Sequence, residues 1–272
     1  MSDFHVRTYL GIDVSPRGKP FTFVALSEDL RLRAVGEGSA GDVLAFAAGQ
    51  SEACAAVNAP AHLNQQLMRQ SEIRHQFTPP PPPRLSNLRA GEYVLMLHDL
   101  HCAHTPADLN DCPPWMRRGL ELYTNLTQLG YAPHPQTGAP RVWLESHAEA
   151  AYCALLNGVV PFAAESLEGR LQRQLALAEN GMSVPDPMDF FEEITRHKLL
   201  RGILPIKDVF SPGELNALVL ALTAWTAQQA PQQIGKVGDE TEGFIYLPKP
   251  LPERTHLQEP LFANRFAHPA ED

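Results

Sequence analysis

The sequence predicts an α/β fold in which a meander of strands is followed by a crossover strand, and three observations lead to this. Residues 6–14 (VRTYLGIDV) form a largely apolar run, which is typical of a strand covered on both faces. Residues 21–27 (FTFVALS) and 31–37 (RLRAVGE) follow after short turns, so we expect three antiparallel strands. A helical pattern over 39–50 then precedes the apolar run at 52–60, which needs a crossover to rejoin the sheet.

The remaining elements alternate between helical and strand patterns, after one interruption. Pro79 to Pro83 cannot lie in a regular helix or a central strand, so we expect an insertion at about 75–113 within a single domain spanning 1–272. Ser211 and Pro212 provide the N-cap and first position of a long apolar helix. The predicted helices cover 113–130, 148–158, 164–181, 186–202 and 211–229, and the predicted strands cover 141–147 and 242–248.

Composition and charge narrow the class of protein. The 272 residues are 44% hydrophobic and 19% charged, as in globular domains, and the net charge of −9 argues against an open basic surface for nucleic acid. No apolar run approaches the ~20 residues of a membrane span, so no membrane partner is expected. The first ten residues lack the pattern of a secretory signal, and the four cysteines are scattered, so we expect a reduced, cytoplasmic protein. No pattern indicates an oligomeric state.

Polar residues follow three of the predicted strands at the point where each strand ends. They are Asp13, Asn58 and Glu145. Such residues can converge on one crevice, where Asp13 and Glu145 would form a hard-oxygen pair suited to Mg²⁺ or Mn²⁺. A buried carboxylate costs several kcal/mol unless a cation or hydrogen-bond donors meet it. The alternative is that each acid ends its strand in a solvated loop, and spacing alone favours that alternative.

An ordered set of sequence segments favours a shared acidic site over acids that end their strands in solvated loops. The GID strand and meander, VNAP (57–60), WMRRGLELYTNL (115–126), WLESHAEAAYCALL (143–156), SLEGRLQRQL (166–175) and LNALVLALTAW (215–225) follow one another along the chain. From Tyr9 to Leu247, outside the proline-rich insertion, this set resembles an uncharacterised family of predicted nucleases, domain of unknown function 429. The resemblance implies an RNase H-like mixed five-stranded sheet with helices on both faces. It also implies metal-dependent phosphodiester hydrolysis with Mg²⁺ or Mn²⁺, acting on nucleic acid, either DNA or RNA.

The resemblance also implies which residues form the site. Similar family members carry Asp at the first strand, Asp in the next motif, Glu after a later strand and Asp in the last helix. Asp13 and Glu145 match the first and third, and are the expected metal ligands. Asn58 and Asn216 stand at the other two catalytic positions and replace charged ligands by neutral amides, which weakens a divalent site. The chain is therefore expected to be a nuclease of reduced activity or, alternatively, a non-catalytic RNase H-fold binding module.

Two further residues are candidates beside the acids. His147 lies two residues after Glu145 and could act as a general base or as the acid for a leaving group, although a histidine at a strand-to-helix junction is more often a cap or a packing residue. Arg170 ends the family-like SLEGR segment and could bind a substrate phosphate, although a basic residue on an amphipathic helix is usually solvated.

Two other interpretations rank lower. The segment from His98 to Cys112 contains zinc-ligand residue types, His98, His101, Cys102, His104 and Cys112, but their spacing matches no common zinc motif, so a polar surface loop is favoured. Actin-like kinases and ATPases also place a phosphate loop after a GID-like strand. They carry two copies of the fold, whereas this chain has room for one and offers only residues 15–20 (SPRGKP) as a candidate loop.

Overall fold

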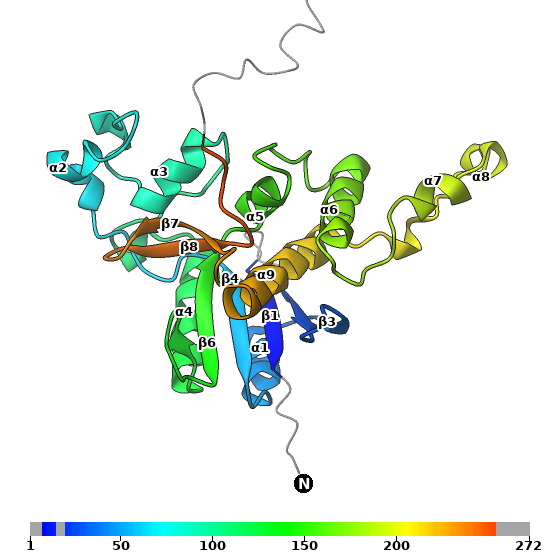
Figure 1. Cartoon of the computed structure of the whole chain (residues 1–272), viewed down its shortest axis with the longest axis horizontal. Helices are drawn as coiled ribbons and strands as arrows, with labels where there is room; N and C mark the ends of the chain where they lie inside the picture. The colour runs from blue at the N-terminus through cyan, green and yellow to red at the C-terminus, as the bar shows by residue number, and fades with distance from the viewer. Residues whose placement is uncertain (1–6, 15–19, 254–272) are drawn as a thin grey trace, which may run out of the picture.

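The computed structural model describes residues 7–14 and 20–253, and within them one mixed sheet carries helices on both faces (Figure 1). Residues 15–19 of the candidate phosphate loop (15–20) lie outside the described residues. The strands are β1 (Thr8–Asp13), β2 (Phe21–Leu26), β3 (Leu32–Gly38), β4 (Ala53–Asn58), β5 (Ala132–Pro133), β6 (Arg141–Ser146), β7 (Gly235–Asp239) and β8 (Gly243–Leu247). The predicted α/β class is confirmed.

The sheet is larger than the expected five strands. In the described part of the chain it has eight, in the order β3-β2-β1-β4-β6-β8-β7, with β5 pairing β6 off this path. The predicted meander is present, because β2 pairs antiparallel with both β1 and β3. β4 returns parallel to β1, and β6 runs parallel to β4. The sequence prediction missed β5 and β7, which are short or interrupted by Gly238 at a φ of 125°.

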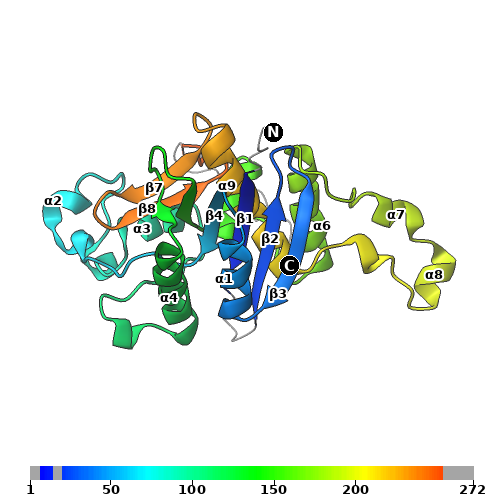
Figure 2. The same ribbon diagram turned by 90° about the horizontal axis from the view of Figure 1, so that it is seen from below.

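Helices cover both faces and divide the apolar core into two main layers. Helices α1 (Ala40–Ala48) and α4 (Pro114–Gln128) pack on one face. Helices α5 (Ala148–Leu155), α6 (Leu167–Glu179) and α9 (Pro212–Gln229) lie on the other (Figure 2). The predicted start of α9 is confirmed, because Ser211 forms a capping box with Glu214 and Pro212 occupies the first turn. None of the described helices is long and apolar enough to cross a membrane.

Helix α9 approaches the sheet unusually closely at Gly11. A Cβ atom on residue 11 would lie 1.8 Å from the carbonyl oxygen of Ala217 and 2.5 Å from the amide nitrogen of Ala221. Both neighbours are backbone atoms, so neither can rotate away. Gly11 therefore sets how near the long apolar helix comes to β1, and thereby where Asn216 lies relative to the end of that strand.

The proline-rich insertion forms short elements rather than a structureless loop. Among the described residues, η1 (Leu67–Arg69) and α2 (Ser71–Arg74) precede the segment expected at about 75–113, which contains η2 (Pro83–Leu85), α3 (Ala90–Leu97) and η3 (Leu109–Asp111). Helix α3 packs against β7, where a Cβ on Gly91 would lie 3.1 Å from Ile245 and 3.3 Å from the backbone of Val237. The N-terminus of α3 is thereby brought to the edge of the sheet that holds the strand ends.

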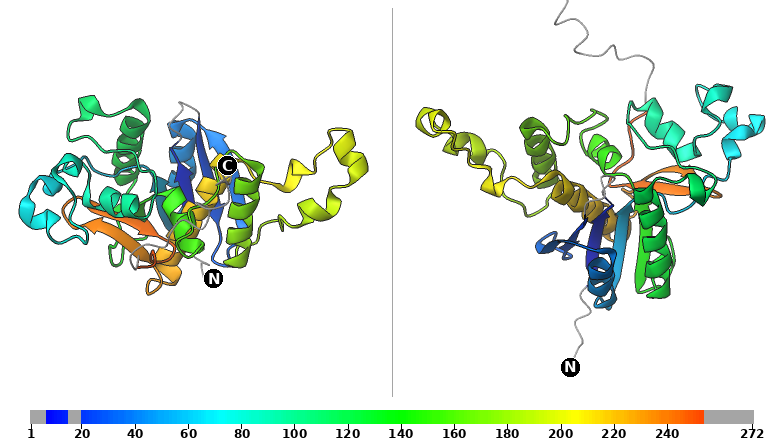
Figure 3. Two further views of the ribbon diagram at one scale, coloured as in Figure 1. Left: turned by 90° about the horizontal axis from the view of Figure 1, so that it is seen from above. Right: turned by 180° about the vertical axis from the view of Figure 1, so that it is seen from behind.

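The single helix predicted over 186–202 is two short helices. They are α7 (Asp189–Glu193) and α8 (Arg196–Leu200), followed by η4 (Ile206–Asp208). Ile194 and Thr195 are extended, and the Thr195 side chain caps α8 by accepting from Lys198 N–H. The N-cap signal at Thr195 therefore overrides the helical periodicity. This segment projects away from the sheet in every view (Figures 1, 2 and 3).

We predict that Gly11→Ala lowers the free energy of unfolding by about 3 kcal/mol or more, because overpacking against backbone atoms cannot be relieved by a rotamer change. Urea denaturation measures the change. Gly41→Ala is the matched control, since its Cβ would meet only Ser39 Oγ at 3.5 Å within α1, and it should be neutral or slightly stabilising. Equal effects of the two substitutions would contradict the close approach of α9.

Candidate functional site

The C-terminal ends of three parallel strands meet at one edge of the sheet. β1, β4 and β6 are neighbours and run in the same direction, so Asp13, Asn58 and Glu145 all lie near that edge. Asp13 and Asn58 are directly paired in register. Paired residues of parallel strands project to the same face, which here is the face covered by α9.

Two neutral amides hold the Asp13 carboxylate. Asn58 Nδ2 donates to Oδ1 at 2.7 Å, and Asn216 Nδ2, from α9, donates to Oδ2 at 3.3 Å. Asp13 is buried, and this burial raises the pKa of its carboxyl group, while the two amide hydrogen bonds act in the opposite direction. Each oxygen therefore has a protein donor, and both donors are neutral amides.

The orientation of the Asn58 amide follows from its two neighbours. Its Oδ1 accepts from the backbone N–H of Ala148 at 3.2 Å, which leaves the NH₂ group facing Asp13. Asn58 thus joins β1, β4 and the first turn of α5. An aspartate at 58 would place a second carboxylate oxygen against Asp13, and that arrangement needs a shared proton or a cation.

Glu145 projects to the opposite face of the sheet. It pairs in register with Val57, whose side chain lies in the layer under α1 and α4, whereas Asn58 faces the other way. Arg89 binds Glu145 through two hydrogen bonds, Nη1 to Oε1 at 2.8 Å and Nη2 to Oε2 at 3.1 Å. The backbone N–H of Ala61 donates to Oε2 at 2.8 Å. Both carboxylate oxygens of Glu145 are therefore engaged.

Arg89 comes from the insertion, directly before α3, and is only 1% exposed. Burial alone would lower the pKa of its guanidinium, but the charge and hydrogen bonds of Glu145 outweigh this effect and the pKa is raised. Nη2 also donates to the carbonyl of Glu242 at 2.8 Å, while Nε has no partner among the described residues. No periodic signal marks Arg89 in the sequence, and the sequence analysis missed it.

Two more buried glutamates surround this ion pair. Glu92 accepts from Arg89 N–H at 3.0 Å, from Thr105 N–H at 3.1 Å and from the Thr105 hydroxyl. Desolvation raises the pKa of Glu92. Glu242 accepts from the backbone N–H of Ala90 at 2.9 Å. These carboxylates accept from the N–H groups of Arg89 and Ala90 at the start of α3, and so hold Arg89 beside Glu145.

A divalent ion shared by Asp13 and Glu145 does not fit this arrangement. The two carboxylates project to opposite faces, the Asp13 oxygens accept from amides, and the Glu145 oxygens accept from a guanidinium and a backbone amide. No group of three or more His, Cys, Asp or Glu side chains that could hold a metal occurs among the residues that the structure describes. Hydrogen bonds join Asp13 to Asn58 and Asn216, whereas the Glu145 carboxylate is bound by Arg89 and Ala61 on the opposite face of the sheet.

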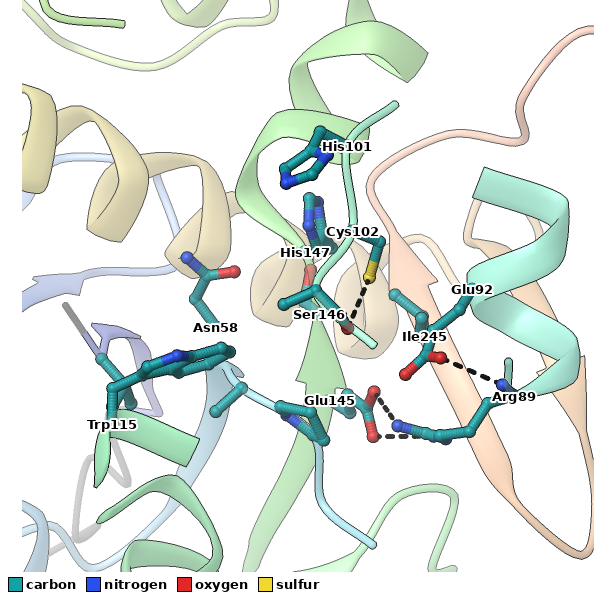
Figure 4. Close-up of a pocket in the computed structure, with 14 residues that line it drawn as sticks. Asn58, Arg89, Glu92, His101, Cys102, Trp115, Glu145, Ser146, His147 and Ile245 are labelled. Atoms are coloured by element: carbon teal, nitrogen blue, oxygen red, sulfur yellow. Dashed lines mark hydrogen bonds and ion pairs between the residues drawn. The ribbon is translucent and has the colours of Figure 1, made fainter. Parts of the chain in front are cut away.

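A cavity of about 300 Å³ opens over the strand ends, between the sheet edge and the insertion (Figure 4). Its polar lining includes Asn58, His101 and His147, and Trp115 and Ile245 give it apolar walls. Arg89, Glu92 and Glu145 border it as well. The insertion therefore covers the site at the strand ends. The sequence analysis predicted the insertion but not its contribution to this site.

His147 caps α5 and also lines the cavity. Its Nδ1 accepts from the backbone N–H of Ala150 at 3.2 Å, so in the neutral ring the proton is on Nε2. Desolvation, and to a lesser extent His101, lowers the pKa of His147 to about 4. The imidazole is therefore neutral near pH 7 and presents an N–H donor. The sequence analysis gave a helix cap as the commoner role for such a histidine, and the structure confirms that His147 is a cap.

The other candidate residues lie elsewhere. Arg170 donates from Nε to the carbonyl of Phe210 at 2.7 Å and from Nη2 to that of Val209 at 2.6 Å, so its guanidinium binds backbone. A role for Arg170 in phosphate binding remains a prediction. His101 and Cys102 line the cavity, and burial raises the pKa of the Cys102 thiol. The segment from His98 to Cys112 thus supplies cavity lining rather than the expected polar surface loop alone.

Comparison with known proteins identifies the family. The family model described as protein of unknown function DUF429 matches residues 11–240. The chain belongs to the DUF429 family. The match includes Asp13, Asn58, Glu145 and Asn216 together with the insertion that carries Arg89. No curated protein and no solved structure matches the chain.

We predict that Arg89→Met in this DUF429 protein lowers the free energy of unfolding by about 3–5 kcal/mol, because it leaves the buried Glu145 carboxylate without its cation. The double variant Arg89→Met with Glu145→Gln should recover a large part of that loss, since it removes both charges. Urea denaturation of wild type, single and double variants completes a double-mutant cycle. Additive losses would show that the two residues do not stabilise each other.

We predict that His147 makes the protein less stable as the pH falls. Its folded pKa of about 4 lies below that of the unfolded chain, so protons bind the unfolded state preferentially in the window from about pH 6.5 down to pH 4. His147→Asn keeps an N-cap acceptor but does not titrate. Between about pH 7 and pH 4.5, wild type should lose about 2 kcal/mol more than the variant. Parallel pH profiles would contradict the depressed pKa.

Proposed function

We propose that this chain is an RNase H-like module that binds an uncharged, planar molecule in the cavity over its strand ends, without a metal ion. The strand order β3-β2-β1-β4-β6 supports the RNase H-like assignment, because an antiparallel meander is followed by two parallel strands. Strands β8 and β7 extend that sheet on the side of the insertion.

One observation carries the metal-free part of the proposal. The carboxylate oxygens that a divalent ion would use already have protein donors, from Asn58 and Asn216 at Asp13 and from Arg89 at Glu145. Mg²⁺ binds proteins mainly through carboxylate charge and retains several waters. Asp13 offers a single negative charge on its face of the sheet, which is a weak basis for such an ion.

The lining of the cavity indicates the class of ligand. Among the residues that the structure describes, the lining contains no lysine, and its one arginine is bound to Glu145, so a phosphate group would find no free lysine or arginine among them. Trp115 offers a flat apolar surface, and the Asn58 amide and the neutral His147 ring can hydrogen-bond a polar rim. A molecule of nucleobase or nucleoside size fits these features.

The experiment is calorimetric titration with adenosine, guanosine, cytidine and uridine in EDTA, each compared with its 5′-monophosphate. We predict that at least one nucleoside binds, that the added phosphate weakens it, and that Trp115→Leu weakens it about tenfold or more through lost stacking. Trp225→Leu is the matched control, because Trp225 bonds to the carbonyl of Glu28 and does not line the cavity. Binding that requires Mg²⁺, or tighter binding of every monophosphate, would contradict the proposal.

A metal-dependent nuclease is the second candidate, favoured by the position of Asp13 and Glu145 at the same edge of the sheet. It requires Arg89 to leave Glu145. Manganese-dependent cleavage of single-stranded DNA or RNA by wild type, lost in Asp13→Ala, would support this candidate. Under our proposal such cleavage is absent, and Mn²⁺ binds only after Asn58→Asp with Asn216→Asp restores two carboxylates beside Asp13.

A further inference from the structure

The segment from residue 186 to residue 208, here called the arm, projects from the body of the molecule (Figures 1 and 3). It carries α7, α8 and η4. Seven apolar side chains of the arm are at least two-fifths exposed, and Leu200 reaches 79%. These residues are Met188, Phe191, Leu199, Leu200, Ile203, Leu204 and Ile206. A set of exposed apolar residues of this size is typical of an interaction surface.

The body of the protein holds both ends of the arm. Gln174 of α6 is fully buried, and its Nε2 donates to the carbonyls of Pro185 and Asp208, each at 2.8 Å. Phe190 and Val209 pack with Leu171 of the same helix. The stems are therefore fixed together, and the apolar residues beyond them are presented on a defined support.

Charge is distributed unevenly along the arm. Its first half is acidic, with Asp186, Asp189, Glu192 and Glu193, and its second half is basic, with Arg196, Lys198, Arg201 and Lys207. Lys198 pairs with Glu193 at 3.4 Å across the boundary, and Lys207 lies 3.9 Å from Asp208. The remaining charged groups, including Asp189, Glu192, Arg196 and Arg201, are exposed. When two arms are placed side by side in opposite directions, the acidic half of each therefore faces the basic half of the other.

We propose that the arms of two copies of this chain pair antiparallel across a two-fold axis and form a homodimer. In such an interface the acidic half of each arm faces the basic half of its partner, and the apolar residues between them are buried. A two-fold interface uses the same patch on both subunits and so must be self-complementary, as this arm is. An anionic membrane or nucleic acid would meet the acidic half unfavourably, which disfavours both as occupants.

Analytical ultracentrifugation of the full chain tests the proposal. The acidic-half variant is Asp189→Lys with Glu192→Lys, and the basic-half variant is Arg196→Glu with Arg201→Glu. The first variant cancels the negative charge of the acidic half and the second cancels the positive charge of the basic half, so each alone should weaken dimerisation about a hundredfold or more. Mixed in equal amounts, the two variants should form a heterodimer, because opposite charges again face each other. Leu199→Ser with Leu200→Ser should also give monomers.

A control variant outside the arm separates loss of dimerisation from a general effect of changed surface charge. Glu121→Lys with Glu240→Lys makes the same change of charge as the acidic-half variant, at exposed sites outside the arm, and should remain dimeric. Circular dichroism confirms that each variant is folded. A wild type that is monomeric at every concentration, a charge-reversed variant that still dimerises alone, or a mixture that stays monomeric would each overturn the proposal.

Discussion

The arrangement of the site depends on how one buried carboxylate, that of Asp13, obtains its hydrogen bonds. An ionised carboxylate at the end of a covered strand costs several kcal/mol unless donors or a cation meet it. Here the donors are the amides of Asn58 and Asn216, which belong to the neighbouring strand and to α9. Because Asn58 also accepts from the first turn of α5, this network joins two strands and two helices at a single point. Gly11 allows α9 to lie close enough for Asn216 to take part.

On the opposite face of the sheet, the buried carboxylate of Glu145 is neutralised by a cation from the insertion. Glu145 ends its strand against Arg89, and the buried Glu92 and Glu242 hold the start of α3 in place. Both carboxylates that the family resemblance assigns to a metal are therefore neutralised or hydrogen-bonded by the chain itself. What remains at the strand ends is a cavity whose Arg89 is paired with Glu145 and whose described lining, under our proposal, receives an uncharged ligand and not a phosphodiester.

The sequence predicted the meander, the crossover strand, helix α9 with its cap, and the positions of Asp13 and Asn58 at neighbouring strand ends. Each of these features depends on local periodicity or on turn and capping residues. It could not predict that Glu145 faces away from Asp13. That outcome depends on a one-residue difference in register, because Glu145 pairs with Val57 and not with Asn58. Arg89 was missed because its role depends on a contact between residues 56 positions apart, in a segment without periodic pattern. The break between α7 and α8 had a signal, the N-cap at Thr195, which the apolar periodicity around it concealed.

The most direct test of the central claim is the titration of the Asp13 carboxyl carbon by ¹³C NMR, with and without excess Mg²⁺. A carboxylate that is buried and held by neutral amides should titrate above the ordinary range of aspartate, and Mg²⁺ should leave the curve unchanged. Asn58→Asp with Asn216→Asp provides the comparison, because the two added carboxylates should raise the pKa of the coupled group further and make it sensitive to Mg²⁺. A wild-type Asp13 that titrates below the ordinary range, or that shifts downward when Mg²⁺ is added, would contradict the account and show that a cation meets this carboxylate.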